Sequence, residues 1–121
     1  MSYPAQFTRL RISDVRTFTA ANDNDVSGVV TVQGQTFDAT GSLYAPGNVI
    51  LRLWPTWNGR VLRVRPYVVE IVWAGMWVFR CPRSNSLCDT LFFYRGDFVA
   101  KKSIDPGRWL YATQTGRIRL K

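Results

Sequence analysis

The segment that most constrains the fold is residues 79–114, where two cysteines precede a strand–turn–strand pattern. Cys81 and Cys88 could form one metal-binding knuckle, the apolar run Leu91–Tyr94 predicts a strand, and Phe98–Lys102 predicts the strand that returns from it. A structural zinc ribbon needs four Cys or His ligands on two such knuckles. The chain contains two cysteines and no histidine. The pattern therefore indicates a zinc-ribbon-like β unit that lacks half of its ligands.

This segment resembles a group of small uncharacterised bacterial proteins, of mobile-element or phage-like origin, that carry an intact or degenerate zinc ribbon. The resemblance rests on Arg80-Cys81-Pro82, Cys88, Leu91-Phe92-Phe93-Tyr94, Gly96, Phe98-Val99 and Leu110-Tyr111-Ala112-Thr113-Gln114. It implies that Ser84 stands at one ligand position and that Ala100 and Ser103 stand at the second pair. We therefore expect no metal or other cofactor, and we interpret Cys81 and Cys88 as relic ligands. The resemblance implies no activity.

The composition is that of one folded domain. The chain has 121 residues, of which 46% are apolar and 14% aromatic, so it can bury a core and is not a disordered polymer. It shows no signal-peptide pattern and no apolar run near the ~20 residues of a membrane helix. We expect a cytoplasmic protein without membrane association. In that compartment its cysteines are expected to be thiols.

Short apolar runs separated by turn residues predict an all-β fold. We expect an antiparallel meander or small sandwich over residues 1–78, continuous with the ribbon-like unit at 79–114 and a basic tail at 115–121. The alternation of Leu10 and Ile12 with arginines predicts a strand. Leu62 and Val64 are expected to point inward, and Asn58-Gly59 predicts a tight hairpin.

Positive charge is concentrated in the second part of the chain. The formal net charge is +8. Residues 1–51 hold three basic and four acidic groups, whereas residues 52–121 hold thirteen basic and four acidic groups. Arginine dominates the basic set, and its planar guanidinium binds two phosphate oxygens at once. A basic surface of this kind fits nucleic acid, and it equally fits an acidic protein surface.

Catalysis has little support, because a chain without histidine has no Ser-His-Asp or Cys-His arrangement. Cations interleaved with aromatic residues instead suggest a non-enzymatic nucleic-acid-binding protein, with single strands favoured. The alternative is a mobile-element interaction module or inhibitor that docks its basic face on an acidic host complex, such as a defence nuclease. Exposed tryptophans beside the arginines would favour the first hypothesis. The candidate binding residues are Arg52, Trp54, Trp57, Arg60, Arg63, Arg65, Arg95, Lys101, Lys102, Arg108, Arg117 and Arg119.

Overall fold

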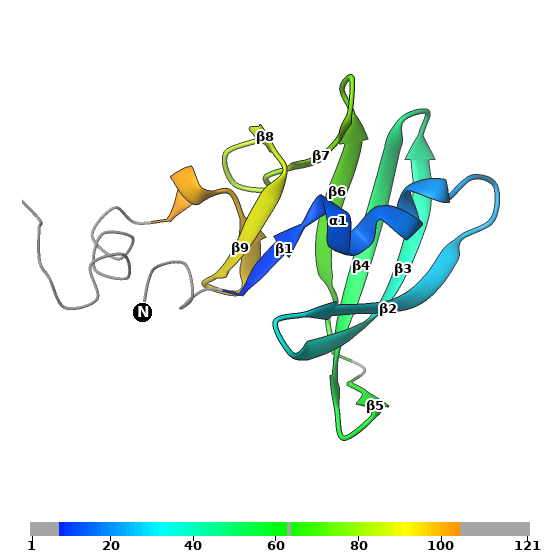
Figure 1. Ribbon diagram of the computed structural model, residues 1–121, viewed down its shortest axis with the longest axis vertical. Coiled ribbons are helices and arrows are strands. Elements are labelled where there is room, and N and C mark those ends of the chain that lie inside the picture. The colour runs from blue at the N-terminus through cyan, green and yellow to red at the C-terminus, as the bar shows by residue number, and fades with distance from the viewer. Residues whose placement is uncertain (1–7, 63, 105–121) are drawn as a thin grey trace, which may run out of the picture.

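The protein is built from two antiparallel sheets, as a computed structural model shows for residues 8–62 and 64–104 (Figure 1). The larger sheet has the strand order β2-β3-β4-β6-β7-β8, with β5 paired to β4, and the smaller sheet has the order β1-β9-β10. The larger sheet consists of β2 (Val26–Val32), β3 (Gln35–Ala45), β4 (Asn48–Trp57), β5 (Arg60–Val61), β6 (Tyr67–Trp73), β7 (Trp77–Arg80) and β8 (Leu87–Cys88). The smaller sheet consists of β1 (Arg9–Arg11), β9 (Thr90–Tyr94) and β10 (Asp97–Val99). The predicted all-β class is confirmed.

Period-two alternation places the core on one face of the larger sheet. In β4, Leu51 and Leu53 are buried on this inner face, while Arg52 is exposed on the outer face and Trp54 is half-buried there. β6 lies between β4 and β7, and its Val69 and Ile71 are also buried. The sequence prediction of a central strand over residues 67–73 is confirmed by these two neighbouring strands.

A short helical segment crosses the inner face of the larger sheet (Figure 1). It comprises α1 (Ile12–Val15) and the 3-10 turn η1 (Arg16–Ala20), and it buries Ile12, Val15 and Phe18. The backbone N–H of Arg11 donates to the Asp14 carboxylate across 2.9 Å, which caps the first turn. The expected strand therefore ends at Arg11, because the Asp14 carboxylate stabilises a helical start immediately afterwards.

Four aromatic rings join the two sheets. Phe37 of β3, Tyr67 of β6, Phe93 of β9 and Phe98 of β10 make edge-to-face contacts with centroid separations between 5.2 and 6.2 Å. Such geometry sets the positive edge of one ring against the negative face of the next. The buried residues of both sheets form one hydrophobic cluster.

The strand–turn–strand prediction is confirmed as β9 and β10, but a zinc-ribbon unit is not shown. The returning strand ends at Val99, since Lys101–Ser103 forms a 3-10 turn, η2. The edge of β9 that does not pair with β10 pairs with β1, where Leu10 lies opposite Leu91. The expected ribbon hairpin is therefore one part of a sheet shared with the beginning of the chain. The segment from Trp109 and the basic tail lie outside the described residues.

Candidate binding surface and cysteine pocket

The β4–β5 hairpin projects beyond the body of the larger sheet (Figure 1), and it carries an exposed tryptophan. Trp57 is 69% exposed and pairs directly opposite Arg60 across the turn. Asn58 and Gly59 have φ values of 51° and 76°, as a tight two-residue hairpin requires. Directly opposed residues point to the same side of an antiparallel pair. The hairpin thus holds an aromatic ring and a guanidinium next to each other in solvent.

Two other predicted residues, Arg52 and Trp54, lie on the other face of β4. Alternation along the strand places them on the outer face of the sheet, where Arg52 lies between Thr40 and Val68 and Trp54 lies opposite Asp38. The structure therefore divides the predicted set between two faces. All four residues at the tip of the hairpin, Trp57–Arg60, are exposed.

The segment that follows the hairpin departs from its predicted pattern. β5 ends at Val61, and Leu62 and Val64 are 40% and 56% exposed instead of pointing inward. The hairpin extends past the core, so alternation no longer places one set of side chains in an interior. Arg65 is exposed and lines a groove of about 730 Å³ between β6 and the loop at Cys81.

The remaining predicted cations are carried by other elements. Arg95 lies in the β9–β10 turn with its guanidinium 5.2 Å from the Tyr94 ring centroid, a separation typical of a cation–π contact. Lys101 and Lys102 are exposed in η2. The structure does not place these three residues on the β4–β5 hairpin. The predicted residues Arg63, Arg108, Arg117 and Arg119 lie outside the described residues.

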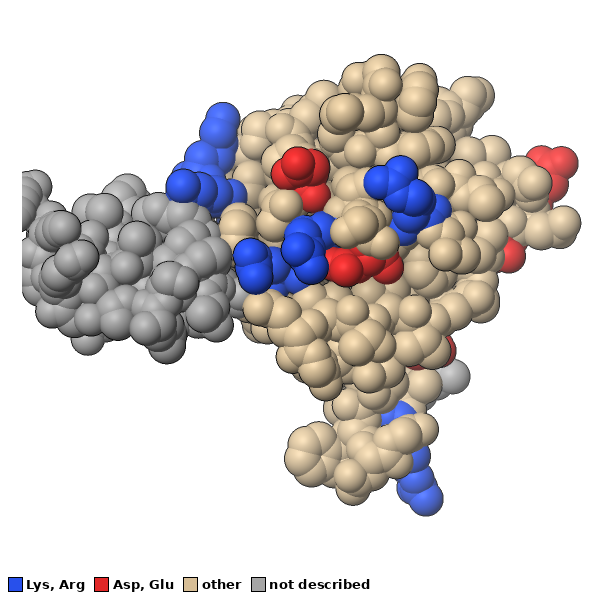
Figure 2. Space-filling view, in the orientation of Figure 1, with Lys and Arg blue, Asp and Glu red and all other residues tan. Residues whose placement is uncertain are grey.

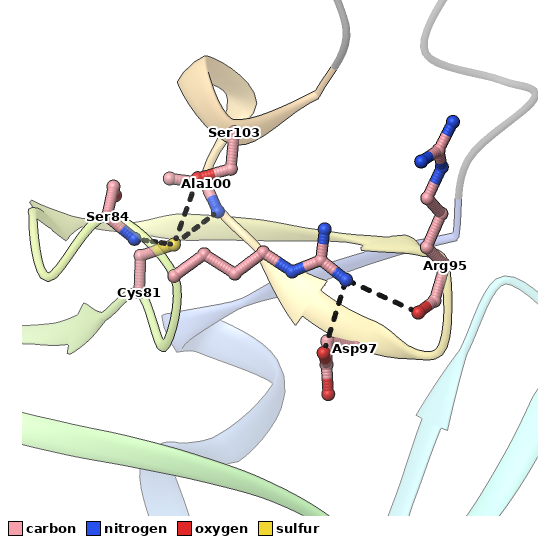
Figure 3. Close-up of polar contacts among 7 residues, drawn as sticks. Cys81, Ser84, Arg95, Asp97, Ala100 and Ser103 are labelled. Carbon is pink, nitrogen blue, oxygen red and sulfur yellow. Dashed lines mark hydrogen bonds and ion pairs between the residues drawn. The ribbon is translucent and has the colours of Figure 1, made fainter.

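The side chain of Cys81 is buried in a pocket of hydrogen-bond donors (Figure 3). Its sulfur accepts from the backbone N–H of Ala100 at 3.2 Å and from that of Ser84 at 3.4 Å. The Ser103 hydroxyl oxygen lies 3.5 Å from the sulfur. Burial raises the pKa of Cys81, but the hydrogen bonds from Ala100, Ser103 and Ser84 outweigh it and lower the pKa to about 6. The pocket therefore favours a thiolate near neutral pH.

The four positions brought together here are those at which the resemblance placed the ligands of an intact ribbon: Cys81, Ser84, Ala100 and Ser103. Cys88 lies on β8 opposite Phe79, and its pKa is raised by burial and, to a smaller extent, by the charge of the nearby Cys81. The interpretation of Cys81 and Cys88 as ligands of one knuckle stays a prediction. Within residues 8–62 and 64–104, no group of three or more His, Cys, Asp and Glu could hold a metal ion.

Cations do not form one continuous patch on the face viewed in Figure 2. Cationic and acidic side chains alternate over its middle, and further cations lie on the projecting hairpin. Sequence reasoning missed Arg11 and Arg16, which line a groove together with Trp77. The charge count for residues 1–51 did not point to these two arginines, because that part of the chain is slightly acidic overall. No local signal connects α1 with β7.

Comparisons with known proteins gave no match among protein-family models, curated proteins or solved structures. None of the helices that the structure describes has the length and apolar character needed to cross a membrane.

Proposed function

We propose that the protein binds single-stranded nucleic acid without catalysing a reaction, and that the β4–β5 hairpin makes the central contact. The observation that carries this proposal is the exposed Trp57 ring directly opposite Arg60. Single-strand binding combines aromatic surfaces on which bases stack with cations that follow the phosphates. Each base has a π-face, so this contact requires no particular sequence.

Neighbouring residues extend the contact beyond one nucleotide. Arg65 follows the hairpin and is exposed beside the groove that Tyr67 also lines. Arg52 lies on the opposite face of β4 from Trp57 and is not part of this contact. The net charge of +8 supplies a long-range attraction for phosphate that salt weakens.

The test is fluorescence anisotropy of labelled single- and double-stranded DNA and RNA between about 50 and 200 mM salt. We expect binding that weakens steeply with salt and favours single strands. Trp57→Ala should weaken it about 5- to 150-fold, the equivalent of about 1–3 kcal/mol for one stacked base. Tyr44→Ala is the matched control, because Tyr44 is 74% exposed and lies on β3 away from the hairpin. Absence of binding at low salt would refute the proposal.

A second candidate is docking on an acidic host protein, as expected for a mobile-element inhibitor. Leu62 and Val64 favour it, because their exposure gives the hairpin apolar area that base stacking on Trp57 does not need. Replacing both residues by serine should weaken a protein complex and leave nucleic-acid affinity unchanged. The same double variant therefore separates the two candidates.

A further inference from the structure

A second groove lies between α1 and the β6–β7 turn, and it combines the same kinds of side chain as the hairpin. Its volume is about 380 Å³, and it is lined by Arg11 at the end of β1, Arg16 of η1, Met76 and Trp77 at the start of β7, and Asp89 and Thr90 at the start of β9. These residues come from three parts of the chain that are distant in sequence. None of them belongs to the predicted binding set.

The aromatic wall of this groove is held in place by a second tryptophan. Trp77 is half-buried and pairs with Trp73, with ring centroids 5.3 Å apart at 67°. Trp73 is itself fixed by its backbone N–H, which donates to the Gly47 carbonyl across 2.8 Å. A ring held in this way offers stacking area at a low cost in side-chain entropy.

The charged rim of the groove has a cationic side and an acidic side. Arg11 and Arg16 are exposed, and the contact from the Arg11 guanidinium to Asp14 is loose, at 3.9 Å. Asp89 accepts a hydrogen bond from the Thr90 hydroxyl at 3.1 Å and has further acceptor capacity. A carboxylate accepts hydrogen bonds from the exocyclic amino group of a base such as cytosine, whereas thymine presents carbonyl oxygens there.

We propose that this groove binds one nucleotide of the strand that the hairpin binds, with its base against Trp77 and its phosphates at Arg11 and Arg16. Asp89 then favours bases that carry an amino group. This inference rests on the proposed function. A groove lined by an aromatic ring and cations can receive a base, whereas insertion into a lipid surface would require apolar side chains that protrude from the protein.

The fold places the groove and the hairpin at opposite ends of one strand. β4 has ten residues, begins beside the Gly47–Trp73 contact and ends at Trp57. At 3.3 Å per residue its ends are about 30 Å apart. A strand of about 4 nucleotides can occupy one site, and about 16 nucleotides can occupy both. Affinity should therefore rise between these lengths.

The experiment measures the affinity of cytidine and thymidine oligonucleotides of about 4 and about 16 nucleotides. Arg11→Ala with Arg16→Ala should weaken the longer complex at least fivefold, lower its salt slope by about two, and leave Trp57-dependent binding of the short thymidine strand intact. Asp89→Asn should remove the preference for cytidine over thymidine. Arg83→Ala is the matched control, because Arg83 pairs with Asp97 and belongs neither to the hairpin nor to the lining of this groove.

The possible outcomes separate this inference from the proposed function. If the Arg11/Arg16 variant behaves like Arg83→Ala while Trp57→Ala weakens binding, only the second site is refuted. A wild-type protein that binds no oligonucleotide refutes both. Binding to vesicles of anionic lipid that Trp73→Ala abolishes, with oligonucleotide affinity unchanged by that substitution, would also refute the nucleotide groove.

Discussion

The sulfur of Cys81 lies 3.5 Å from the hydroxyl oxygen of Ser103, which is 22 residues later in the chain. The contact joins the loop after β7 to the turn that follows β10 (Figure 3). Together with the N–H groups of Ser84 and Ala100, it surrounds one sulfur with donors. Such a set stabilises negative charge on sulfur and has consequences for stability and for metal chemistry.

The Cys81 thiolate should make folding stability depend on pH. Its pKa is about 6 in the folded protein against 9.0 for an ordinary thiol. A depressed pKa gives stability that is fully present above pH 9 and is lost as pH falls through 6. Between these values, the free energy of unfolding of the wild type should rise relative to Cys81→Ala by at most roughly 1.4 kcal/mol per pH unit. Urea unfolding across this window measures the difference, and parallel curves for the two proteins would contradict it.

Introducing thiols at the three other positions around Cys81 should create a metal site. We expect the variant with Ser84→Cys, Ala100→Cys and Ser103→Cys to bind one Zn²⁺ or Co²⁺ in tetrahedral geometry, because four thiolates would then surround one point. Cobalt absorption spectra and metal titration measure this. The same triple variant with Cys81→Ala is the control and should bind less tightly. A triple variant that binds no metal would show that the four positions do not converge closely enough.

Two glycines that face Phe18 should respond differently to an added methyl group. A Cβ at Gly41 would lie 3.0 Å from the Phe18 Cβ and 3.3 Å from its carbonyl oxygen. Gly41→Ala should therefore destabilise the protein by about 1–3 kcal/mol through overpacking. A Cβ at Gly28 would lie 3.4 Å from the Phe18 ring, which is ordinary contact. Gly28→Ala is the matched control, and equal losses in thermal unfolding would contradict this prediction.

Arg60 should contribute to nucleic-acid affinity through phosphate contact alone. Arg60→Ala should weaken binding to all sequences to a similar degree and should lower the slope of log affinity against log salt by about one. Arg83→Ala, which removes a cation engaged by Asp97 at 3.4 Å, should change the slope less. A sequence-dependent loss in Arg60→Ala would assign this residue to base recognition instead.

The sequence predicts the regular parts of the fold well because their signals are local. The alternation around Leu51 and Leu53 identifies β4 and its buried face, and Asn58-Gly59 identifies its hairpin. The same alternation misplaces Leu62 and Val64, since the pattern cannot reveal that the chain has already left the core. The helix α1 was not predicted, because a segment of four residues spans about one turn and is too short to show a helical periodicity.

The site is predictable only where it lies within one segment. Trp57 and Arg60 are close in sequence, and their spacing about the turn indicates that they are neighbours. The groove of Arg11 and Trp77 depends on which strands lie next to one another, and no local pattern carries that information. Spacing and resemblance did identify Ser84, Ala100 and Ser103 as the positions that meet Cys81.

The pairing of β1 with β9 sets an order for folding during synthesis. Leu10 precedes its partner in the sheet, Leu91, by 81 residues. Until β9 has left the ribosome, β1 has no strand to pair with. The buried side chains of α1, which directly follows β1, then remain exposed on the side where β9 will lie. Contacts between such distant residues close late, because a large loop must first be ordered. An interrupted chain that ends before residue 90 would therefore leave β1 unpaired and its apolar residue Leu10 exposed, and such a segment is a substrate for chaperones and proteases.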